Sequence, residues 1–194
     1  PHQLLAKLLE GLSGEDPRVI VGPRVGEDAA AIEFGDRLLL AKTDPITFAT
    51  DLIGWYAVNV NANDIACLGG SPRWFLATLL LPEQATQKDV TSIFAQIGEA
   101  CRELGVTVVG GHTEITLGID RPILIGCMLG EVAREKLVSS AGAQPGDALI
   151  LSGPIAIEGT ALLAREVGEE LRAKGVAEEA IARAKNLLFA PGIS

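Results

Sequence analysis

The spacing of apolar and polar residues divides the first 144 residues into helices and strands in mixed order. Segments with apolar residues every three or four positions predict amphipathic helices, and short apolar runs bounded by glycine or charged residues predict strands. Helices are predicted over 2–12, 51–68 and 86–104, and strands over 18–21, 29–34, 37–44, 73–82, 106–111 and 121–132. This order predicts an α+β domain in which a mixed sheet is covered on one face by the two longer helices.

The last fifty residues have a different pattern. A turn-rich boundary over 141–153 leads into one predicted strand, and two helices are predicted over 158–175 and 177–189. One strand and two helices are too few to close a sheet, so residues 145–194 are expected to be the incomplete start of a second domain after a first domain over 1–144. We expect this part to pack poorly, or to dock on a neighbouring chain, because its helices present apolar faces without a sheet to cover them.

The helix predicted over 51–68 carries an unusual polar arc. Val58, Ala62 and Ile65 share the face that would pack on a sheet. The opposite arc carries Asn59, Asn61, Asn63 and Asp64. Asparagine and aspartate are mediocre helix formers, because their side chains compete for backbone hydrogen bonds. Two interpretations remain open at this point: a polar face in contact with solvent, or a packed polar site.

Three other short stretches favour the packed site. Asp28 precedes a predicted strand, Thr43 and Asp44 end another, and "VVGGHTEIT" places Gly110, Gly111, His112 and Glu114 late in a third. Each has an ordinary explanation as a turn or bulge when it is taken alone. Aspartates gathered at one place would repel one another and have raised pKa values unless a cation joined them, and Mg²⁺ takes oxygen ligands of this kind. Magnesium in turn suggests a phosphate-bearing ligand.

Composition limits the classes of partner. The chain has 194 residues, 48% of them hydrophobic, and a formal net charge of −9. A surface for nucleic acid or an anionic membrane would need clustered Lys and Arg, so neither partner is expected. No apolar run approaches the roughly 20 residues of a membrane helix. The three cysteines, which are widely spaced and lie in apolar segments, predict buried free thiols in a reducing compartment, and therefore a cytoplasmic protein.

Four of these stretches together resemble a known family. "GEDAA", "KTD", "NANDIACLGGSPRW" and "VVGGHTEIT", in this order, are similar to the amino-terminal domain of the aminoimidazole-ribonucleotide synthetase superfamily. The later "GDALILSGPIAIEGTALLARE" resembles the entry to the carboxy-terminal α/β domain of that superfamily. The resemblance implies that two sheets pair across a two-fold axis as a barrel-like homodimer.

The resemblance also implies a nucleotide site. Asp28 and Asp64 would hold Mg²⁺ against the phosphates of ATP, Asp44 would complete the acidic cluster, and Asn61 and Asn63 would support it. The Gly110–Gly111 pair would let the backbone approach the phosphates, because glycine lacks Cβ. The residues expected to bind nucleotide are Asp28, Thr43, Asp44, Asn61, Asn63, Asp64, Gly110, Gly111, His112 and Thr113, with Asp28, Asp44 and Asp64 as metal ligands.

The shared chemistry implied by the resemblance is ATP-dependent phosphorylation of an amide or similar oxygen. The short start before "VGEDAA" and the "EGTALLARE" segment look nearest the hydrogenase-maturation branch, which acts on carbamoyl groups and suggests a maturation protein as partner. His112 stands where the thiamine monophosphate kinase branch has an acidic residue, which weakens that alternative. An enzyme like aminoimidazole-ribonucleotide synthetase and a non-catalytic, dimerising nucleotide-binding module are further alternatives. Because active sites of the superfamily lie between two domains, this chain by itself is expected to be inert and at best a weak nucleotide binder.

Overall fold

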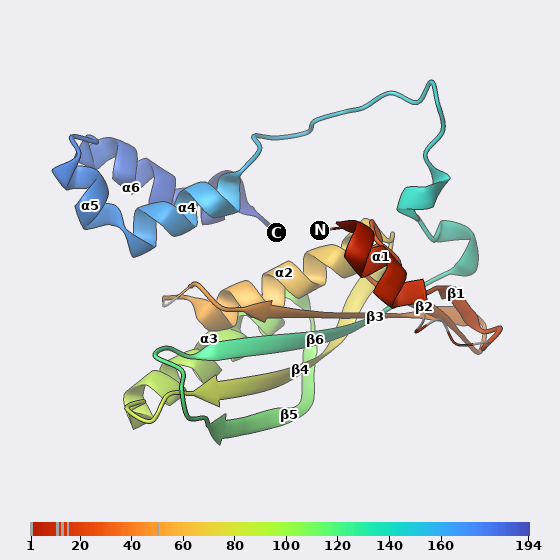
Figure 1. Cartoon of the computed structure of the whole chain (residues 1–194), viewed down its shortest axis with the longest axis horizontal. Helices are drawn as coiled ribbons and strands as arrows, with labels where there is room; N and C mark the ends of the chain where they lie inside the picture. The colour runs from red at the N-terminus through yellow and green to blue at the C-terminus, as the bar shows by residue number, and fades with distance from the viewer. Residues whose placement is uncertain (1, 11, 13, 15, 50) are drawn as a thin grey trace.

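A six-stranded mixed sheet forms the body of the protein. The computed structural model describes residues 2–10, 12, 14, 16–49 and 51–194. The strands are β1 (Val19–Val21), β2 (Ala30–Phe34), β3 (Arg37–Ile46), β4 (Ser71–Leu81), β5 (Thr107–Ile115) and β6 (Ile123–Val132). Their order across the sheet is β1-β2-β3-β6-β4-β5, in which β4 and β5 are parallel and every other neighbouring pair is antiparallel. The predicted α+β fold with a mixed sheet is confirmed (Figure 1).

Two helices cover one face of this sheet, as predicted. They are α2 (Ile53–Cys67) and α3 (Gln87–Leu104), and α2 lies over β3, β6 and β4 (Figure 1). Along β6, buried residues alternate strictly with half-buried ones. Since successive side chains of a strand point to opposite faces, the buried set faces the helices and the half-buried set faces the other side. This second face is called the open face below.

Glycines on β6 allow α2 to lie close to the sheet. A Cβ on Gly126 would overlap the Asn61 amide, and one on Gly130 would overlap the Ile65 side chain. The apolar residues Val58, Ala62 and Ile65 of α2 are buried, as predicted. Asn59 and Asn61 are buried too, so the interpretation of a polar arc in contact with solvent is wrong for these two asparagines.

The ends of α3 follow from local sequence signals. Thr86 and Asp89 form a capping box, in which the Thr86 side chain accepts from the Asp89 backbone N–H and the Asp89 carboxylate accepts from the Thr86 backbone N–H. Gly105 ends the helix in the left-handed conformation, with φ of 66°. The predicted helix over 86–104 is therefore confirmed almost to the residue.

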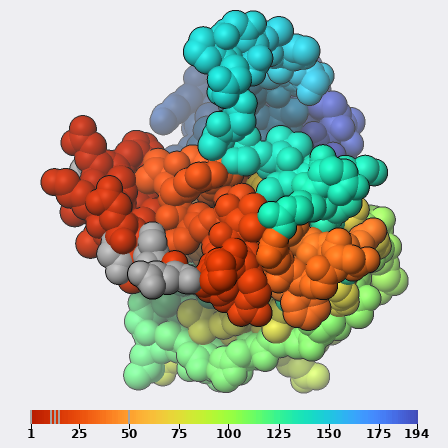
Figure 2. Space-filling view, turned by 90° about the vertical axis from the view of Figure 1, so that its right-hand side faces the viewer, coloured from red at the N-terminus to blue at the C-terminus, as the bar shows by residue number. Residues whose placement is uncertain are grey.

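The strand predicted after residue 146 does not form. Leu149 is 102% and Ile150 is 86% exposed, and residues 147–153 belong to no strand. A strand needs a neighbour for its backbone hydrogen bonds, and this segment has none within the described part of the chain. Figure 2 shows the cyan segment after β6 on the surface of the molecule.

The remaining elements are short helices. α1 (His2–Glu10) precedes the sheet, and the single-turn helices η1 (Arg134–Lys136) and η2 (Ser140–Gly142) follow it. The predicted helix over 158–175 is divided into α4 (Ile157–Glu166) and α5 (Gly168–Ala173), and α6 (Glu178–Asn186) is followed by an irregular turn, η3 (Leu188–Gly192). No helix among the described residues has the length and apolar character needed to cross a bilayer.

The carboxy-terminal helices pack mainly on one another, and the turn after them contacts α2. Ala161 and Leu188 are buried in the same apolar core as the sheet residues. The rings of Trp55 and Phe189 meet edge to face with centroids 5.3 Å apart, and Arg165 forms an ion pair with Asp51. The segment before α4 is exposed as expected, and Leu163 and Phe189 are 60% and 51% exposed, so docking of this part on a neighbouring chain stays a prediction.

Candidate functional site

An ion-pair cluster joins β3 to α2 and defines the candidate site. Lys42 and Asp44 are two residues apart on β3, so their side chains point to the same face, towards α2. The Lys42 Nζ lies 2.9 Å from Oδ2 of Asp64 on α2 and 3.4 Å from Oδ2 of Asp44. The Lys42 and Asp64 side chains are only 17% and 19% exposed, so this is a partly buried ion pair with the charges in a shielded place.

The charges of the cluster influence one another. Burial is the largest cause that raises the pKa of Asp64; the Lys42 hydrogen bond and charge act in the opposite direction, and the charges of Asp28 and Asp44 raise the pKa further. For Lys42, burial favours the neutral form, but its hydrogen bonds with Asp64 and Asp44 and the charges of both carboxylates outweigh burial and raise its pKa. Asp28 and Asp44 therefore both lie within electrostatic reach of Asp64.

Asn61 lies buried beneath this cluster, with Nδ2 donating to the Ala57 carbonyl at 2.8 Å and to the Asp44 carbonyl at 3.4 Å. Its Oδ1 is buried with no donor among the described residues. An unpaired buried acceptor costs about 1–3 kcal/mol. The role of Asn61 as a support of the nucleotide site stays a prediction; in the structure its amide holds the backbone of Asp44.

Of the other predicted residues of this region, Thr43 and Asn63 have hydrogen-bond partners and Asp28 is exposed. Asp28 is exposed in the turn before β2. The Thr43 hydroxyl donates to the Gly126 carbonyl at 2.9 Å, and Asn63 Nδ2 donates to the Ile193 carbonyl at 2.6 Å. The contact of Asn63 places the carboxy-terminal turn next to the cluster.

The glycine-rich stretch of β5 lies apart from the aspartates. Across the sheet, Gly111 is paired with Ala77 of β4, and Ala77 with Gly126 of β6. Gly126 is in turn paired with Asp44. Gly111 and Asp44 thus share one row but are separated by three strand spacings, roughly 14 Å.

Gly110, Gly111, His112 and Thr113 line a cavity of about 480 Å³ instead. Its other wall comes from β4 and from Phe94 and Ile97 of α3. The His112 Nε2 lies 3.0 Å from the Glu114 carboxylate, which agrees with a histidine that is hydrogen-bonded at this edge of the sheet. Within one chain, the structure therefore forms two separate places from the predicted residues.

Two charged residues beside Asp44 and Asp64, a lysine and a glutamate, were not among the predicted site residues. Lys42 is the first residue of "KTD", and its position two residues before Asp44 on a strand is the signal that could have identified it. Glu158, near the start of α4, has a raised pKa because protein removes water around it and because Asp44 and Asp64 repel its charge. No spacing in the sequence could have identified Glu158, because its position depends on how α4 docks.

The donor set can be tested against Mg²⁺. In the part of the chain that the structure describes, no group of three or more His, Cys, Asp or Glu side chains is placed to hold a metal ion. Mg²⁺ usually binds through one or two carboxylates and takes its other ligands from phosphates and water. Asp44 and Asp64 supply two carboxylates of that chemistry, so they fit a metal that arrives with a phosphate group.

The fold and this site define a class of protein. The family model "AIR synthase related protein, N-terminal domain" matches residues 26–132, which are more than half of the chain, and the chain belongs to this family. The match includes the sheet from β2 to β6 and the helices α2 and α3 that cover it.

Particular relatives are similar over this region. The "Putative hydrogenase expression/formation protein MJ0676" of Methanocaldococcus jannaschii is 33% identical over 73% of this chain and 44% of its own length. The "Thiamine-monophosphate kinase" of Pyrococcus horikoshii is 33% identical over 77% of this chain and 50% of its own length. The solved structure "AaThiL complexed with AMPPCP and TMP" has a TM-score of 0.75 at 24% identity, covering 98% of this chain and 58% of that one. The chain thus spans about half the length of the curated relatives it matches.

Proposed function

We propose that the chain is the amino-terminal part of a Mg-ATP-dependent enzyme that phosphorylates an amide or carbonyl-type oxygen. The observation that carries this proposal is that Asp44 of β3 and Asp64 of α2 both contact the ammonium group of Lys42, in a partly buried place. Among reactions of this class, a hydrogenase-maturation activity on a carbamoyl group is our first choice, supported by the 33% identical hydrogenase expression/formation relative. A maturation protein as partner and a cytoplasmic location belong to the same proposal.

The residues of the chain would act by holding and orienting the nucleotide. Asp44 and Asp64 would ligate Mg²⁺ bound to the phosphates, and Asp28 would add negative charge beside them. The metal would neutralise charge that develops on the transferred phosphoryl group. Asn61 Nδ2 holds the backbone of Asp44 and so fixes one ligand relative to α2. The half-buried position of the cluster limits water around the reacting groups.

The β5 stretch would complete the site through a second copy of the chain. Gly110–Thr113 lie roughly 14 Å from Asp44 in one chain, which is three strand spacings. The open face of the sheet carries apolar residues without a covering layer among the described residues, such as the half-buried Leu76 and Leu129. We therefore retain the homodimer with paired sheets as part of the proposal.

An activity like that of thiamine-monophosphate kinase is the second candidate. The relative from Pyrococcus horikoshii supports it at 33% identity. The solved structure with AMPPCP, a nucleotide analogue, supports nucleotide binding by this fold under either candidate. His112 favours the first candidate, because the resemblance leads us to expect an acidic residue there in the kinase. An activity like that of aminoimidazole-ribonucleotide synthetase, and a non-catalytic nucleotide-binding module, remain as further alternatives.

Calorimetric titration of the full chain with ATP in excess Mg²⁺ tests the proposal. Asp64→Asn removes a charged metal ligand and is expected to weaken binding by at least about tenfold, which corresponds to ~1.4 kcal/mol. The matched control is Asp36→Asn, which removes an exposed carboxylate in the turn between β2 and β3 and should leave affinity unchanged. Equal affinities of Asp64→Asn and the wild-type chain would disprove the metal role.

A further inference from the structure

Lys42 occupies the place between the two carboxylates where a divalent cation would bind. We propose that Lys42 is a built-in counterion that keeps free metal out of the site and moves to the phosphates when metal and nucleotide arrive together. This inference rests on the proposed function. It gives Lys42, to which the motifs assigned no role, the role of controlling metal binding.

The geometry makes lysine and metal competitors. One Nζ contacts Oδ2 of Asp64 at 2.9 Å and Oδ2 of Asp44 at 3.4 Å. Mg²⁺ would need these oxygens at about 2.0–2.1 Å, so it would lie within a few ångströms of the ammonium group. Like charges at that separation repel strongly in a shielded site. A metal without nucleotide must therefore displace Lys42 from both carboxylates and leave its charge without a partner.

The ammonium group of Lys42 can move while its backbone stays in place. Its backbone is held within the sheet, where β3 is paired with both β2 and β6. Lysine carries its charge on a flexible four-carbon stem with three donors, so the ammonium group can leave a carboxylate for a phosphate oxygen without movement of the strand. When a metal occupies the two carboxylates, Lys42 loses its ion pairs with them. The phosphates of a nucleotide would give Lys42 new negatively charged partners.

Removal of the lysine would leave a strongly attractive site for cations. Asp64 is already influenced by the charges of Asp28 and Asp44, and Glu158 is influenced by Asp44 and Asp64. Lys42 is the cation that the structure places among these carboxylates. Without it, four neighbouring acidic groups would repel one another until another cation bound.

Mn²⁺ binding without nucleotide, measured by electron paramagnetic resonance on the full chain, tests the inference. Lys42→Gln is expected to bind Mn²⁺ at least about tenfold more tightly than the wild type, because the competing charge is gone. Lys42→Arg keeps the charge and should exclude Mn²⁺ as the wild type does. Lys88→Gln on α3 removes an exposed lysine away from the cluster and is the matched control.

A second readout follows the movement of Lys42. In the wild type, added ATP should tighten Mn²⁺ binding by at least about tenfold, and in Lys42→Gln this gain should fall to a few-fold, because no ion pair has to be broken. Circular dichroism checks that each variant is folded, and Lys42→Met replaces Lys42→Gln if the latter is unfolded. Equal Mn²⁺ affinity of the wild-type and neutral variants without nucleotide would overturn the inference.

The two proposals fail in different ways. If the wild type binds Mg-ATP but the neutral variants gain no affinity for Mn²⁺, the counterion role is wrong and the proposed function stands. If the neutral variants gain Mn²⁺ affinity but no chain binds ATP, Lys42 still excludes free metal, whereas its movement to the phosphates and the nucleotide site proposed for this chain are wrong.

Discussion

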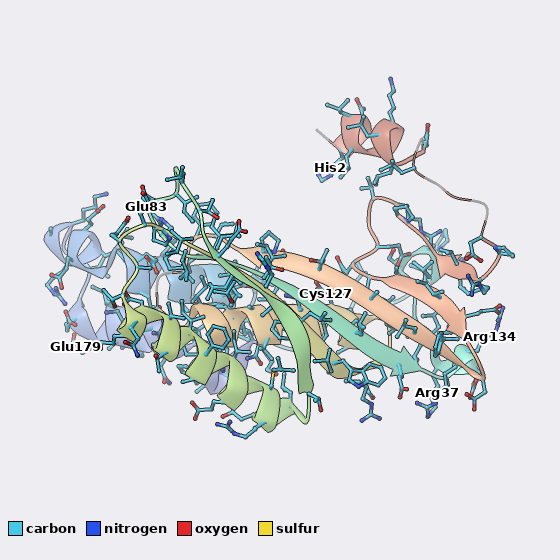
Figure 3. The ribbon with its side chains drawn as sticks, turned by 90° about the horizontal axis from the view of Figure 1, so that it is seen from below. His2, Arg37, Glu83, Cys127, Arg134 and Glu179 are labelled. Atoms are coloured by element: carbon cyan, nitrogen blue, oxygen red, sulfur yellow. The ribbon has the colours of Figure 1, made fainter. Side chains whose placement is uncertain are left out.

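The two faces of the sheet are made by the same strands but meet different surroundings. On the face under α2 and α3, side chains such as Phe75, Leu124 and Met128 are fully buried. On the open face, the neighbouring positions of β6 are only half-buried, including Cys127 and Leu129. Figure 3 labels Cys127 near the middle of the sheet, with Arg37 and Arg134 at one end.

The two parts of the candidate site lie in one row of the sheet but differ in what covers them. The Lys42–Asp44–Asp64 cluster lies on the helix-covered face, where α2 brings its ligands to β3. The predicted β5 residues lie on an exposed edge strand, all of whose residues are exposed. A single chain therefore brings the carboxylates together by itself, whereas its glycine-rich strand is exposed.

The largest expected effect compares two leucines of one strand. Leu124→Ala removes a side chain that is 0% exposed and should lower the free energy of unfolding by about 2–5 kcal/mol. Leu129→Ala, its matched control on the open face, should cost about 1 kcal/mol or less. Urea unfolding followed by circular dichroism at low protein concentration measures both.

Equal losses in the two leucine variants would show that the open face is packed as tightly as the helix-covered one. A loss in Leu129→Ala that grows with protein concentration would indicate that a second copy covers the open face, because association stabilises the native state by mass action.

A smaller effect is expected from two glycines. A Cβ on Gly126 would lie 2.8 Å from the Phe75 ring and would overlap the Asn61 amide, so Gly126→Ala should destabilise the fold by about 1–3 kcal/mol. A Cβ on Gly110 would have its nearest neighbour at 3.9 Å, an ordinary contact, so Gly110→Ala should stay within about 0.5 kcal/mol. Thermal unfolding measures the pair, and a Gly110→Ala variant as unstable as Gly126→Ala would contradict the assignment of faces.

Sequence reasoning was accurate where structure depends on neighbours in the chain. The period of apolar residues places α3, whose first turn the Thr86 capping box then fixes. It failed at Leu149 and Ile150, because a strand forms only beside another strand. The break between α4 and α5 falls at Val167 and Gly168, two residues of low helix propensity, and could have been predicted.

The candidate site was predictable only in part for the same reason. Asp44 and Asp64 were identified by their motifs, and in the structure both contact the ammonium group of Lys42. The role of Lys42 requires knowledge of which strand face α2 covers, and that of Glu158 requires the docking of α4. The separation of Gly111 from Asp44 follows from the strand order, which no local pattern specifies.

The smallest expected effect is a change in the pKa of Glu114 on β5, and it tests the role of His112. The hydrogen bond with His112 is the largest cause that lowers the pKa of the Glu114 carboxyl, and Thr116 adds a second donor. Because a donor stabilises the charged form of a carboxylate, His112→Ala should raise the pKa of Glu114 towards its ordinary value, with Thr116→Val giving a smaller rise as the control. Carboxyl carbon NMR over a pH series measures both, and an unchanged pKa in His112→Ala would show that the pair does not persist in solution. Repeating the series with Mg-ATP then distinguishes two roles of His112. A rise in the pKa of Glu114 on nucleotide binding that is absent in His112→Ala means that the histidine has turned to the ligand, whereas a rise of equal size in both proteins reflects the charge of the phosphates. An unchanged pKa means that His112 only holds Glu114.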